Sequence, residues 1–311
     1  MRQQSTPDIL ILDKKDTPWC QSIIDWLPSQ YSCVVTRRTD DIDLSAVSIL
    51  IGAPPDLAPV ISQCPRIQWV QSTWAGIDAI SHFASESLIV TALKGVFGQS
   101  MTEYVFGWLL ALERGVLDHA NAHSWYPAIG NSTYGKTLGI MGTGSIGSVL
   151  TPIAKQFGMR CRGLNTDGRD VEGFDRVFAS ADRLLFAEGV DYLVNTLPKT
   201  PATARIIDQT LLAKLNADAI IINVGRGNAV NGDALIGALT SGTLRYAVLD
   251  VFEQEPLPAE HPFWVQSNLF ITSHTAAVTP SEGIVDAFKE NFTCFTQDKP
   301  LQHRVLPKRG Y

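Results

Sequence analysis

Three polar residues in the second half of the chain have side chains suited to acid–base chemistry, and each follows a predicted strand. Arg226 lies between two glycines, Glu255 precedes a proline, and His274 comes shortly after the apolar run 269–272. A histidine titrates near neutrality and can give a proton to a carbonyl oxygen during reduction. A nearby carboxylate favours the protonated imidazole, and an arginine can bind a substrate carboxylate and polarise the carbonyl. These residue types suit hydride transfer to a 2-oxo acid.

Each candidate also has a plainer interpretation. An arginine between glycines can be a surface turn, and Glu253 is as ionisable as Glu255. The loop-like positions of three other histidines predict solvated side chains: His82, His261 and His303. His119 and His123 have the spacing of two metal ligands, but Ala120 stands where a metalloprotease helix carries glutamate. No third ligand is evident near them, so no metal site is predicted.

A glycine fingerprint follows the predicted strand 137–141. Gly142, Gly144 and Gly147 have Gly-x-Gly-x-x-Gly spacing, a predicted helix 148–157 comes next, and Gly158 is placed to end it. Such a turn brings backbone N–H groups to a pyrophosphate at a helix N-terminus, where the helix dipole favours negative charge. The fingerprint and its context predict a bound dinucleotide.

The elements that position these residues alternate between buried strands and helices. Strands are predicted at 9–12, 33–36, 48–51, 68–71 and 88–91, then at 137–141, 160–164, 191–196, 219–224, 246–250 and 269–272. This rhythm indicates an α/β fold with parallel sheets, whose ligands bind beyond the carboxyl ends of the strands. Ser100 and Glu103 predict a capping box at the start of a long helix between the two series. A final helix, 281–295, is expected to return to the first domain, which gives domains 1–98 with 281–311 and 99–280.

These motifs resemble the D-isomer-specific 2-hydroxyacid dehydrogenase family, in particular its glyoxylate/hydroxypyruvate reductase-like members, over nearly the whole chain. The resemblance implies two doubly wound domains, a flavodoxin-like substrate-binding domain and a Rossmann dinucleotide-binding domain, with the active site in the cleft between them. It implies that His274 donates the proton in reduction, that Glu255 is its partner, and that Arg226 binds the substrate carboxylate and carbonyl. Ser273 departs from the family, where proline often precedes the histidine.

The resemblance also implies the ligand contacts. Backbone amides in segment 71–78 would hold the substrate carboxylate, with Trp74, Ala75, Gly76 and Ile77 as the expected residues. Asp250 would receive the nicotinamide carboxamide. The other expected cofactor contacts are Gly142, Gly144, Ser145, Ile146 and Gly147 at the pyrophosphate, and Thr196, Leu197, Pro198, Val224 and Gly225 along the adenosine and nicotinamide ribose sides.

The residues after the predicted strand 160–164 favour NADP(H) over NAD(H). NAD-selective folds carry an acidic residue about 20 positions past the glycines to bind the ribose 2′-hydroxyl. Asn165 stands there instead, where it and Thr166 could donate hydrogen bonds to a 2′-phosphate, and Arg169 could add a charged contact. Asp167 and Asp170 lie in the same segment and could reverse the preference, so NAD(H) stays possible.

Composition argues against several other classes. A net charge of −6 does not suit the binding of nucleic-acid phosphates. Five scattered cysteines without C-x-x-C spacing predict reduced thiols and a cytoplasmic location: Cys20, Cys33, Cys64, Cys161 and Cys294. Segment 1–8 has no apolar signal core, and the longest apolar stretch, 104–112, is too short to span a membrane. The expected partners are a small 2-oxo or 2-hydroxy acid and, by the family resemblance, a second copy of the chain through the helix that begins at Ser100.

Rival functions remain open. Corepressors of the C-terminal-binding-protein type resemble this family and use a dinucleotide to control assembly. Formate oxidation occurs on the same fold but pairs the histidine with glutamine, which Glu255 argues against. Within the favoured class, a substrate such as 3-phosphoglycerate stays open.

Overall fold

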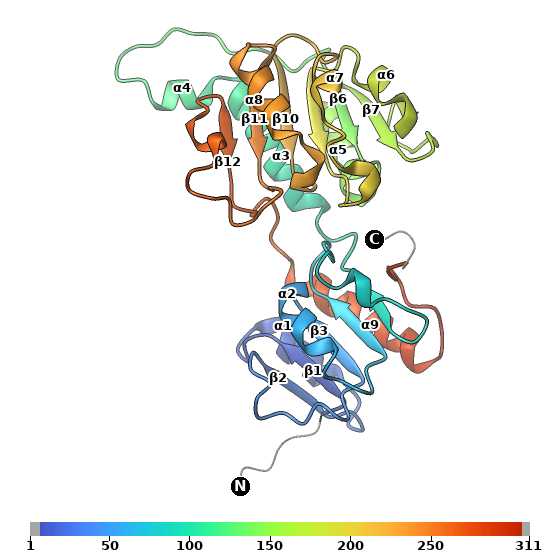
Figure 1. Ribbon diagram of the computed structural model, residues 1–311. Coiled ribbons are helices and arrows are strands. Elements are labelled where there is room, and N and C mark those ends of the chain that lie inside the picture. The colour runs from blue at the N-terminus through green and yellow to red at the C-terminus, as the bar shows by residue number, and fades with distance from the viewer. Residues whose placement is uncertain (1–6, 307–311) are drawn as a thin grey trace. The chain divides into compact units, whose positions relative to one another are not determined.

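The computed structural model describes residues 7–306, and the chain divides into two compact units. The first unit comprises Met1–Val96 and Thr279–Tyr311, and the second comprises Phe97–Val278 (Figure 1). These divisions, after Val96 and Val278, each lie two residues before the ones predicted from the sequence. Of the N-terminal segment considered for a signal core, residues 1–6 lie outside the described residues.

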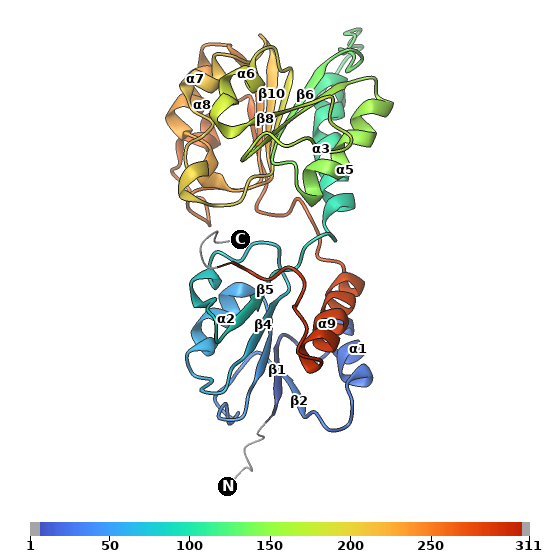
Figure 2. The same ribbon diagram turned by 90° about the vertical axis from the view of Figure 1, so that its right-hand side faces the viewer.

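The first unit is a five-stranded parallel sheet with helices on both faces. Its strands are β1 (Ile9–Leu12), β2 (Cys33–Thr36), β3 (Ile49–Gly52), β4 (Trp69–Ser72) and β5 (Ile89–Thr91), in the order β2-β1-β3-β4-β5. Helices α1 (Pro18–Trp26) and α9 (Ser281–Thr296) lie on one face and α2 (Pro54–Ile61) on the other (Figure 2). Trp69 of β4 stacks on Phe288 of α9 with ring centroids 5.5 Å apart. The C-terminal helix is therefore part of the first unit's core.

The second unit is a seven-stranded parallel sheet. Its strands are β6 (Thr137–Met141), β7 (Arg160–Asn165), β8 (Arg176–Ala179), β9 (Tyr192–Asn195), β10 (Ala219–Asn223), β11 (Leu244–Leu249) and β12 (Leu269–Ile271). Its helices are α3 (Gly98–Glu113), α4 (Val116–Ala120), α5 (Ser145–Gln156), α6 (Arg183–Ala187), α7 (Gln209–Leu212) and α8 (Gly232–Thr240). The order β12-β11-β10-β9-β6-β7-β8 reverses direction between β6 and β9, the switch point at which doubly wound sheets bind ligands. The predicted α/β class is confirmed.

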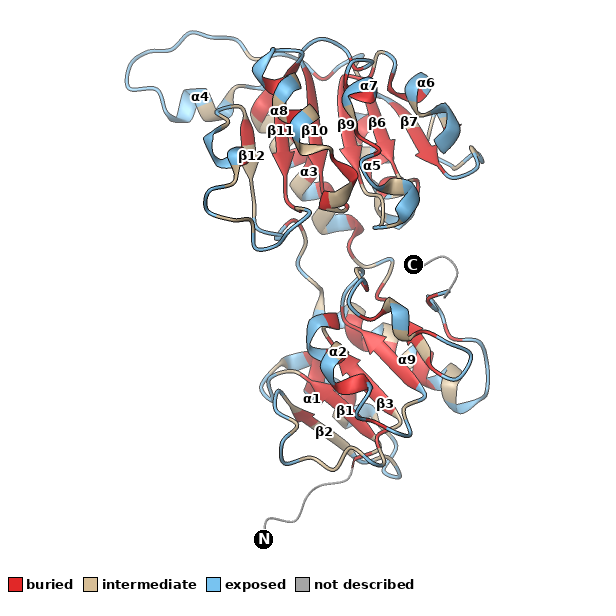
Figure 3. Cartoon of the chain, in the orientation of Figure 1, coloured by how far each residue is buried: buried red, intermediate tan, exposed pale blue. Residues whose placement is uncertain are grey.

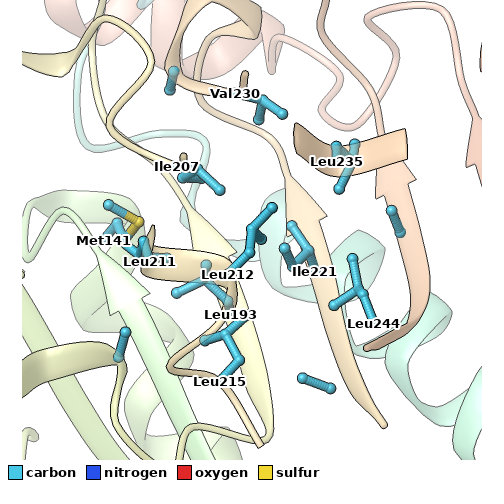
Figure 4. Close-up of a cluster of buried hydrophobic side chains, with 14 of the residues drawn as sticks. Met141, Leu193, Ile207, Leu211, Leu212, Leu215, Ile221, Val230, Leu235 and Leu244 are labelled. Atoms are coloured by element: carbon cyan, nitrogen blue, oxygen red, sulfur yellow. The ribbon is translucent and has the colours of Figure 1, made fainter. Parts of the chain in front are cut away.

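Both faces of this second sheet are buried, which explains the continuous apolar runs of its central strands (Figure 3). Alternate residues of β9 enter opposite cores, because side chains of a strand alternate between the two faces: Leu193 enters one hydrophobic cluster and Val194 enters the other. Figure 4 shows the first of these clusters, in which strand residues meet residues of α7 and α8; the labelled side chains include Leu193, Ile221, Leu244, Leu212 and Leu235.

Two helices begin earlier than the sequence analysis placed them. Helix α3 begins at Gly98 with Phe97 as N-cap and no side-chain cap, so the predicted capping box at Ser100 is wrong; Glu103 instead accepts a hydrogen bond from the Gln99 side chain at 2.7 Å. The first turn of α3 packs closely against α5, since a Cβ at Gly98 would lie 2.8 Å from Val149. Helix α5 begins just after Gly144, so Gly144 is its N-cap and Gly147 lies in its first turn.

Three further features can be compared with the sequence: an edge strand, the cysteines and the apolarity of the helices. Strand β8 was not predicted; it is a short edge strand that pairs only with β7 in the described sheet, and its sequence begins with an exposed arginine. All five cysteines are free. Among the described residues, no helix combines the length and apolarity that crossing a membrane requires.

Candidate active site

The imidazole of His274 is bound to a carboxylate. Its Nδ1 lies 2.8 Å from Oε2 of Glu255, and Oε1 of the same carboxylate accepts a hydrogen bond from the Phe252 N–H, also at 2.8 Å. An ionised carboxylate can only accept, so Nδ1 carries the hydrogen of this bond. Nε2 is then the nitrogen that can exchange a proton, and the imidazole is 50% exposed, which leaves it accessible to a ligand.

The turn that presents His274 is held by Asp250. His274 has φ +56°, a conformation uncommon for a non-glycine residue, and its N–H donates to the Asp250 carbonyl at 2.8 Å. The Asp250 carboxylate is almost fully buried and accepts hydrogen bonds from the Thr272 hydroxyl at 2.5 Å and from the N–H groups of Thr275 and Ala276 at 2.8 and 3.0 Å. Asp250 therefore fixes the chain on both sides of the histidine. Its contact with a nicotinamide stays a prediction.

Two residues that the sequence analysis did not single out extend this network. The hydroxyl of Tyr104, from α3, lies 2.6 Å from the hydroxyl of Thr272. Burial raises the pKa of Tyr104 to about 12, so its hydroxyl stays protonated at neutral pH and can donate to Thr272, which donates in turn to Asp250. The strand-end position of Thr272 was a usable sequence signal. Tyr104 lies in a helix where the apolar pattern gives no such signal.

Arg226 lies on a turn whose two glycines are required by close backbone contacts. A Cβ at Gly225 would lie 2.8 Å from the backbone nitrogen of Leu197, and one at Gly227 would collide with the backbone of Phe252. The Arg226 side chain donates to the Gly225 carbonyl at 2.7 Å. Phe252 also donates to Glu255, so the arginine turn and the glutamate loop meet at the same residue. An isolated surface turn does not describe this arrangement.

The three fingerprint glycines serve different purposes. Gly142 has φ +101°, and a Cβ there would lie 2.5 Å from the Thr196 hydroxyl oxygen. A Cβ at Gly147 would collide with the Gly142 carbonyl oxygen. A Cβ at Gly144, in contrast, would have no protein atom within 4 Å. The fold requires the first and third glycines, whereas the open space at Gly144 fits the close approach of a dinucleotide pyrophosphate.

Two buried asparagines shape the segments expected to line the cofactor. Asn195 ends β9 and Asn223 ends β10, and the Asn195 amide donates to the Asn223 side-chain oxygen at 2.8 Å. The same oxygen accepts from the Gly225 N–H at 3.1 Å, the Asn195 oxygen accepts from the Leu197 N–H at 3.2 Å, and the Asn223 amide donates to the Arg226 carbonyl at 3.2 Å. Sequence reasoning missed both residues. Their signal was a polar residue at the carboxyl end of an otherwise apolar strand.

In the first unit, the loop after β4 carries the expected substrate-binding residues. The Ser72 hydroxyl accepts from the Trp74 N–H and donates to the Trp74 carbonyl, both at 2.9 Å, and the Leu93 N–H donates to that carbonyl at 3.1 Å. The Trp74 side chain is 44% exposed, and Ala75 is exposed beside it. The side chain of Ile77 is buried in the core, which leaves its backbone as the group that could meet a ligand.

Comparison with known proteins identifies the family. The model of the D-isomer specific 2-hydroxyacid dehydrogenase NAD-binding domain matches residues 106–276. Glyoxylate/hydroxypyruvate reductase A of Serratia proteamaculans is 31% identical over 261 residues, covering 80% of this chain and 82% of that protein. The chain belongs to the D-isomer specific 2-hydroxyacid dehydrogenase family.

Solved structures of this family agree with the fold. A D-isomer specific 2-hydroxyacid dehydrogenase family protein from Aeromonas salmonicida aligns with a TM-score of 0.89 and 32% identity, covering 98% of this chain and 100% of that chain. An NADPH-dependent glyoxylate/hydroxypyruvate reductase from Sinorhizobium meliloti, in complex with NADP and sulfate, aligns with a TM-score of 0.85 and 26% identity over 98% of this chain and 100% of its own.

The loop after β7 of this dehydrogenase carries the residues expected to select the cofactor. The Asn165 side chain is nearly buried; its amide donates to the Thr143 hydroxyl at 3.1 Å and to the Arg169 carbonyl at 2.9 Å, and its oxygen accepts from the Gly168 N–H at 2.6 Å. Both amide hydrogens are thus engaged within the protein. Asn165 shapes the loop, while Thr166 is exposed and Arg169 projects into solvent.

One histidine of the pair considered for a metal, His119, has another partner. The His119 ring lies 3.0 Å from the Ala128 carbonyl oxygen through Nε2. Within residues 7–306, no group of three or more histidine, cysteine, aspartate or glutamate side chains is placed to hold a metal ion.

Proposed function

We propose that this dehydrogenase reduces a small 2-oxo acid of the glyoxylate and hydroxypyruvate class to the D-2-hydroxy acid, or to glycolate, with NADPH favoured over NADH. The observation that carries the proposal is the His274–Glu255 pair, joined to the Arg226 turn through Phe252. Relatives named as glyoxylate/hydroxypyruvate reductases and the NADP complex of the Sinorhizobium enzyme support the substrate class and the cofactor.

Each residue has a defined task in this proposal. The dinucleotide, when bound at the fingerprint, supplies the hydride for the carbonyl carbon. His274 gives the proton at Nε2 to the carbonyl oxygen, and Glu255 keeps Nδ1 in its donor form. Arg226 binds the substrate carboxylate and stabilises the negative charge that develops on the carbonyl oxygen. The backbone amides of loop 74–77 provide a second hold on the carboxylate.

The proposal assigns the two units different roles. The second unit is the dinucleotide-binding domain, with Arg169 on the 2′-phosphate of NADPH, and the first unit is the substrate-binding domain. We further propose that the protein acts in the cytoplasm as a homodimer. Its free cysteines suit the reducing cytoplasm. The dimer was expected through the helix that begins at Ser100, but Val105, Leu109 and Leu112 of that helix are buried in the core of their own unit, so we assign the subunit interface to the exposed apolar side chains after α4.

The test is a panel of 2-oxo acids assayed by the loss of NADPH absorbance, with NADH compared in parallel. Glyoxylate and hydroxypyruvate should be reduced, a 3-phosphorylated 2-oxo acid more slowly, and formate should not be oxidised. His274→Ala should lower kcat by at least about a thousandfold while NADPH still binds, and Arg226→Ala should both raise KM and lower kcat. Binding of NADPH without turnover of any acid would favour the corepressor-type alternative instead.

A further inference from the structure

The loop after β7 contains an ion pair between two residues that are two positions apart, Asp167 and Arg169. The Asp167 carboxylate accepts a hydrogen bond from Nη1 of Arg169 at 3.0 Å and a weaker one from the Arg169 N–H at 3.5 Å. The backbone under the pair is fixed, because Asn165 binds both Gly168 and Arg169 and a bridge joins Asp167 to Ala179 of β8. The two side chains are nevertheless 60% and 65% exposed, so both can meet a ligand.

The two residues of this ion pair suit different cofactors. Arg169 can bind a 2′-phosphate only by sharing or leaving its bond with Asp167. The Asp167 carboxylate, which repels a phosphate, is also a suitable acceptor for the 2′-hydroxyl of NADH. Desolvation raises the pKa of Asp167, but its hydrogen bonds and the Arg169 charge have the larger combined effect and lower the pKa below its ordinary value. The carboxylate is therefore ionised at neutral pH.

We propose that Asp167 is a cofactor-selectivity residue that competes with the NADPH 2′-phosphate for Arg169 and offers an acceptor to the NADH 2′-hydroxyl. This inference rests on the proposed function, in which Arg169 binds the 2′-phosphate. The loop thereby accepts both dinucleotides, with a smaller preference for NADPH than Arg169 alone would give. The sequence left open whether Asp167 or Asp170 opposes NADPH, and the pairing in the structure favours Asp167.

The experiment measures dissociation constants of NADPH and NADH directly, by nucleotide fluorescence on the intact protein, so no turnover is needed. The variants are Asp167→Asn, Arg169→Ala and the double variant. Asp170→Asn is the matched control, because it removes the same charge one residue beyond Arg169, whose described ion-pair partner is Asp167. Thermal midpoints of all variants should stay close to that of the natural protein, because these side chains are exposed.

The expected result is that Asp167→Asn tightens NADPH binding about two- to fivefold, the range that an exposed ion pair supports, without tightening NADH binding. Asp170→Asn should change NADPH affinity less. In the Arg169→Ala background the gain from Asp167→Asn should be clearly smaller, because only the direct repulsion between Asp167 and the phosphate is then left to remove.

Equal gains from Asp167→Asn and Asp170→Asn would overturn the inference, since they would indicate a general charge effect. A gain of undiminished size without Arg169 would also overturn it. These outcomes differ from failure of the proposed function: in that case the natural protein would bind neither dinucleotide, or Arg169→Ala would leave the NADPH dissociation constant unchanged.

Discussion

The histidine proposed as the proton donor is held by a buried carboxylate rather than by its own backbone preference. His274 has a positive φ, a type of conformation that costs about 1–3 kcal/mol and persists where its surroundings enforce it. Asp250 provides that enforcement through hydrogen bonds on both sides of the histidine. Hydrogen bonds to a charged acceptor are stronger than neutral ones. The direction of Nε2 therefore depends on groups that need not contact the substrate.

Replacing Thr272 by valine should impair catalysis without impairing cofactor binding. The change removes the hydroxyl that donates to Asp250 at 2.5 Å and loosens the turn of His274. We expect kcat to fall about tenfold, equivalent to about 1.4 kcal/mol, while the NADPH dissociation constant changes less than twofold. Thr272→Ser keeps the hydroxyl and should restore most of the rate. A valine variant with the natural kcat would contradict the role given to this contact.

Gly144→Ala should weaken cofactor binding and leave stability unchanged, whereas Gly147→Ala should lower the stability of the fold. Gly144 has extended backbone angles, φ −81° and ψ −162°, and open space at its Cβ, so alanine should fold normally but obstruct the pyrophosphate. We expect NADPH affinity to fall at least about tenfold with little change in thermal midpoint. Gly147→Ala forces a methyl group against the Gly142 carbonyl and should lower the free energy of unfolding by about 1–3 kcal/mol or more. Denaturation and nucleotide titration separate the two effects, and a destabilised Gly144 variant with normal affinity would contradict them.

At the level of elements, apolar runs predicted the buried strands well, because both faces of each sheet are covered. The edge strand β8 was missed because an edge strand needs fewer apolar residues. The start of α3 was missed because it has no side-chain cap that the sequence could show, and because Gly98 is required by packing against α5, a helix distant in sequence. The residue types of His274, Glu255 and Arg226 suggested the chemistry that is proposed for the site, and the structure brings His274 and Glu255 together. The hydrogen bond between Asn195 and Asn223 could not be predicted, since it depends on the pairing and register of β9 and β10, which the sequence does not give.

One element contact has a pH dependence that can be measured. Asp208 caps α7, where its side chain accepts from the Leu211 N–H at 2.9 Å, and it binds Arg183 of α6 at 2.9 Å. Partial burial raises its pKa, but hydrogen bonds from Thr210 and Leu211 and the Arg183 charge outweigh that effect and lower the pKa below 3.8. The folded protein thus favours the ionised form, so the stabilisation is complete above the unfolded-state pKa and is lost as pH falls through the folded-state pKa.

Asp208→Ala should therefore lower the free energy of unfolding by about 1 kcal/mol at neutral pH. In urea denaturation from pH 8 downward, the gap between the variant and the natural protein should stay constant to about pH 5 and narrow below about pH 4. Asp233→Asn is a suitable control, because Asp233 lies in the first turn of α8 while Asn231 is the cap. A gap that widens on acidification would contradict the sign of the pKa shift.

At the level of the whole molecule, the proposed dimer requires a surface to bury. The segment between α4 and β6 extends away from the body of the second unit (Figure 1) and exposes large apolar side chains: Trp125 is 92% exposed, Ile129 is 91% exposed and Tyr134 is 81% exposed. Exposed apolar residues gathered on one segment are typical of association surfaces, and aromatic anchors contribute most of the binding energy at such surfaces.

The double variant Trp125→Ser/Ile129→Ser should consequently dissociate while each chain stays folded. Both side chains have little contact with their own subunit, so the thermal stability of the monomer should change little. Each anchor buried in a dimer is worth about 1–3 kcal/mol, so the dimer dissociation constant should rise at least about a hundredfold in analytical ultracentrifugation. Leu185→Ser is the control, because Leu185 is 56% exposed on α6, away from this segment in sequence, and its loss should leave the dimer intact. If the double variant sediments as the natural protein does, the segment after α4 is not the surface that joins two copies.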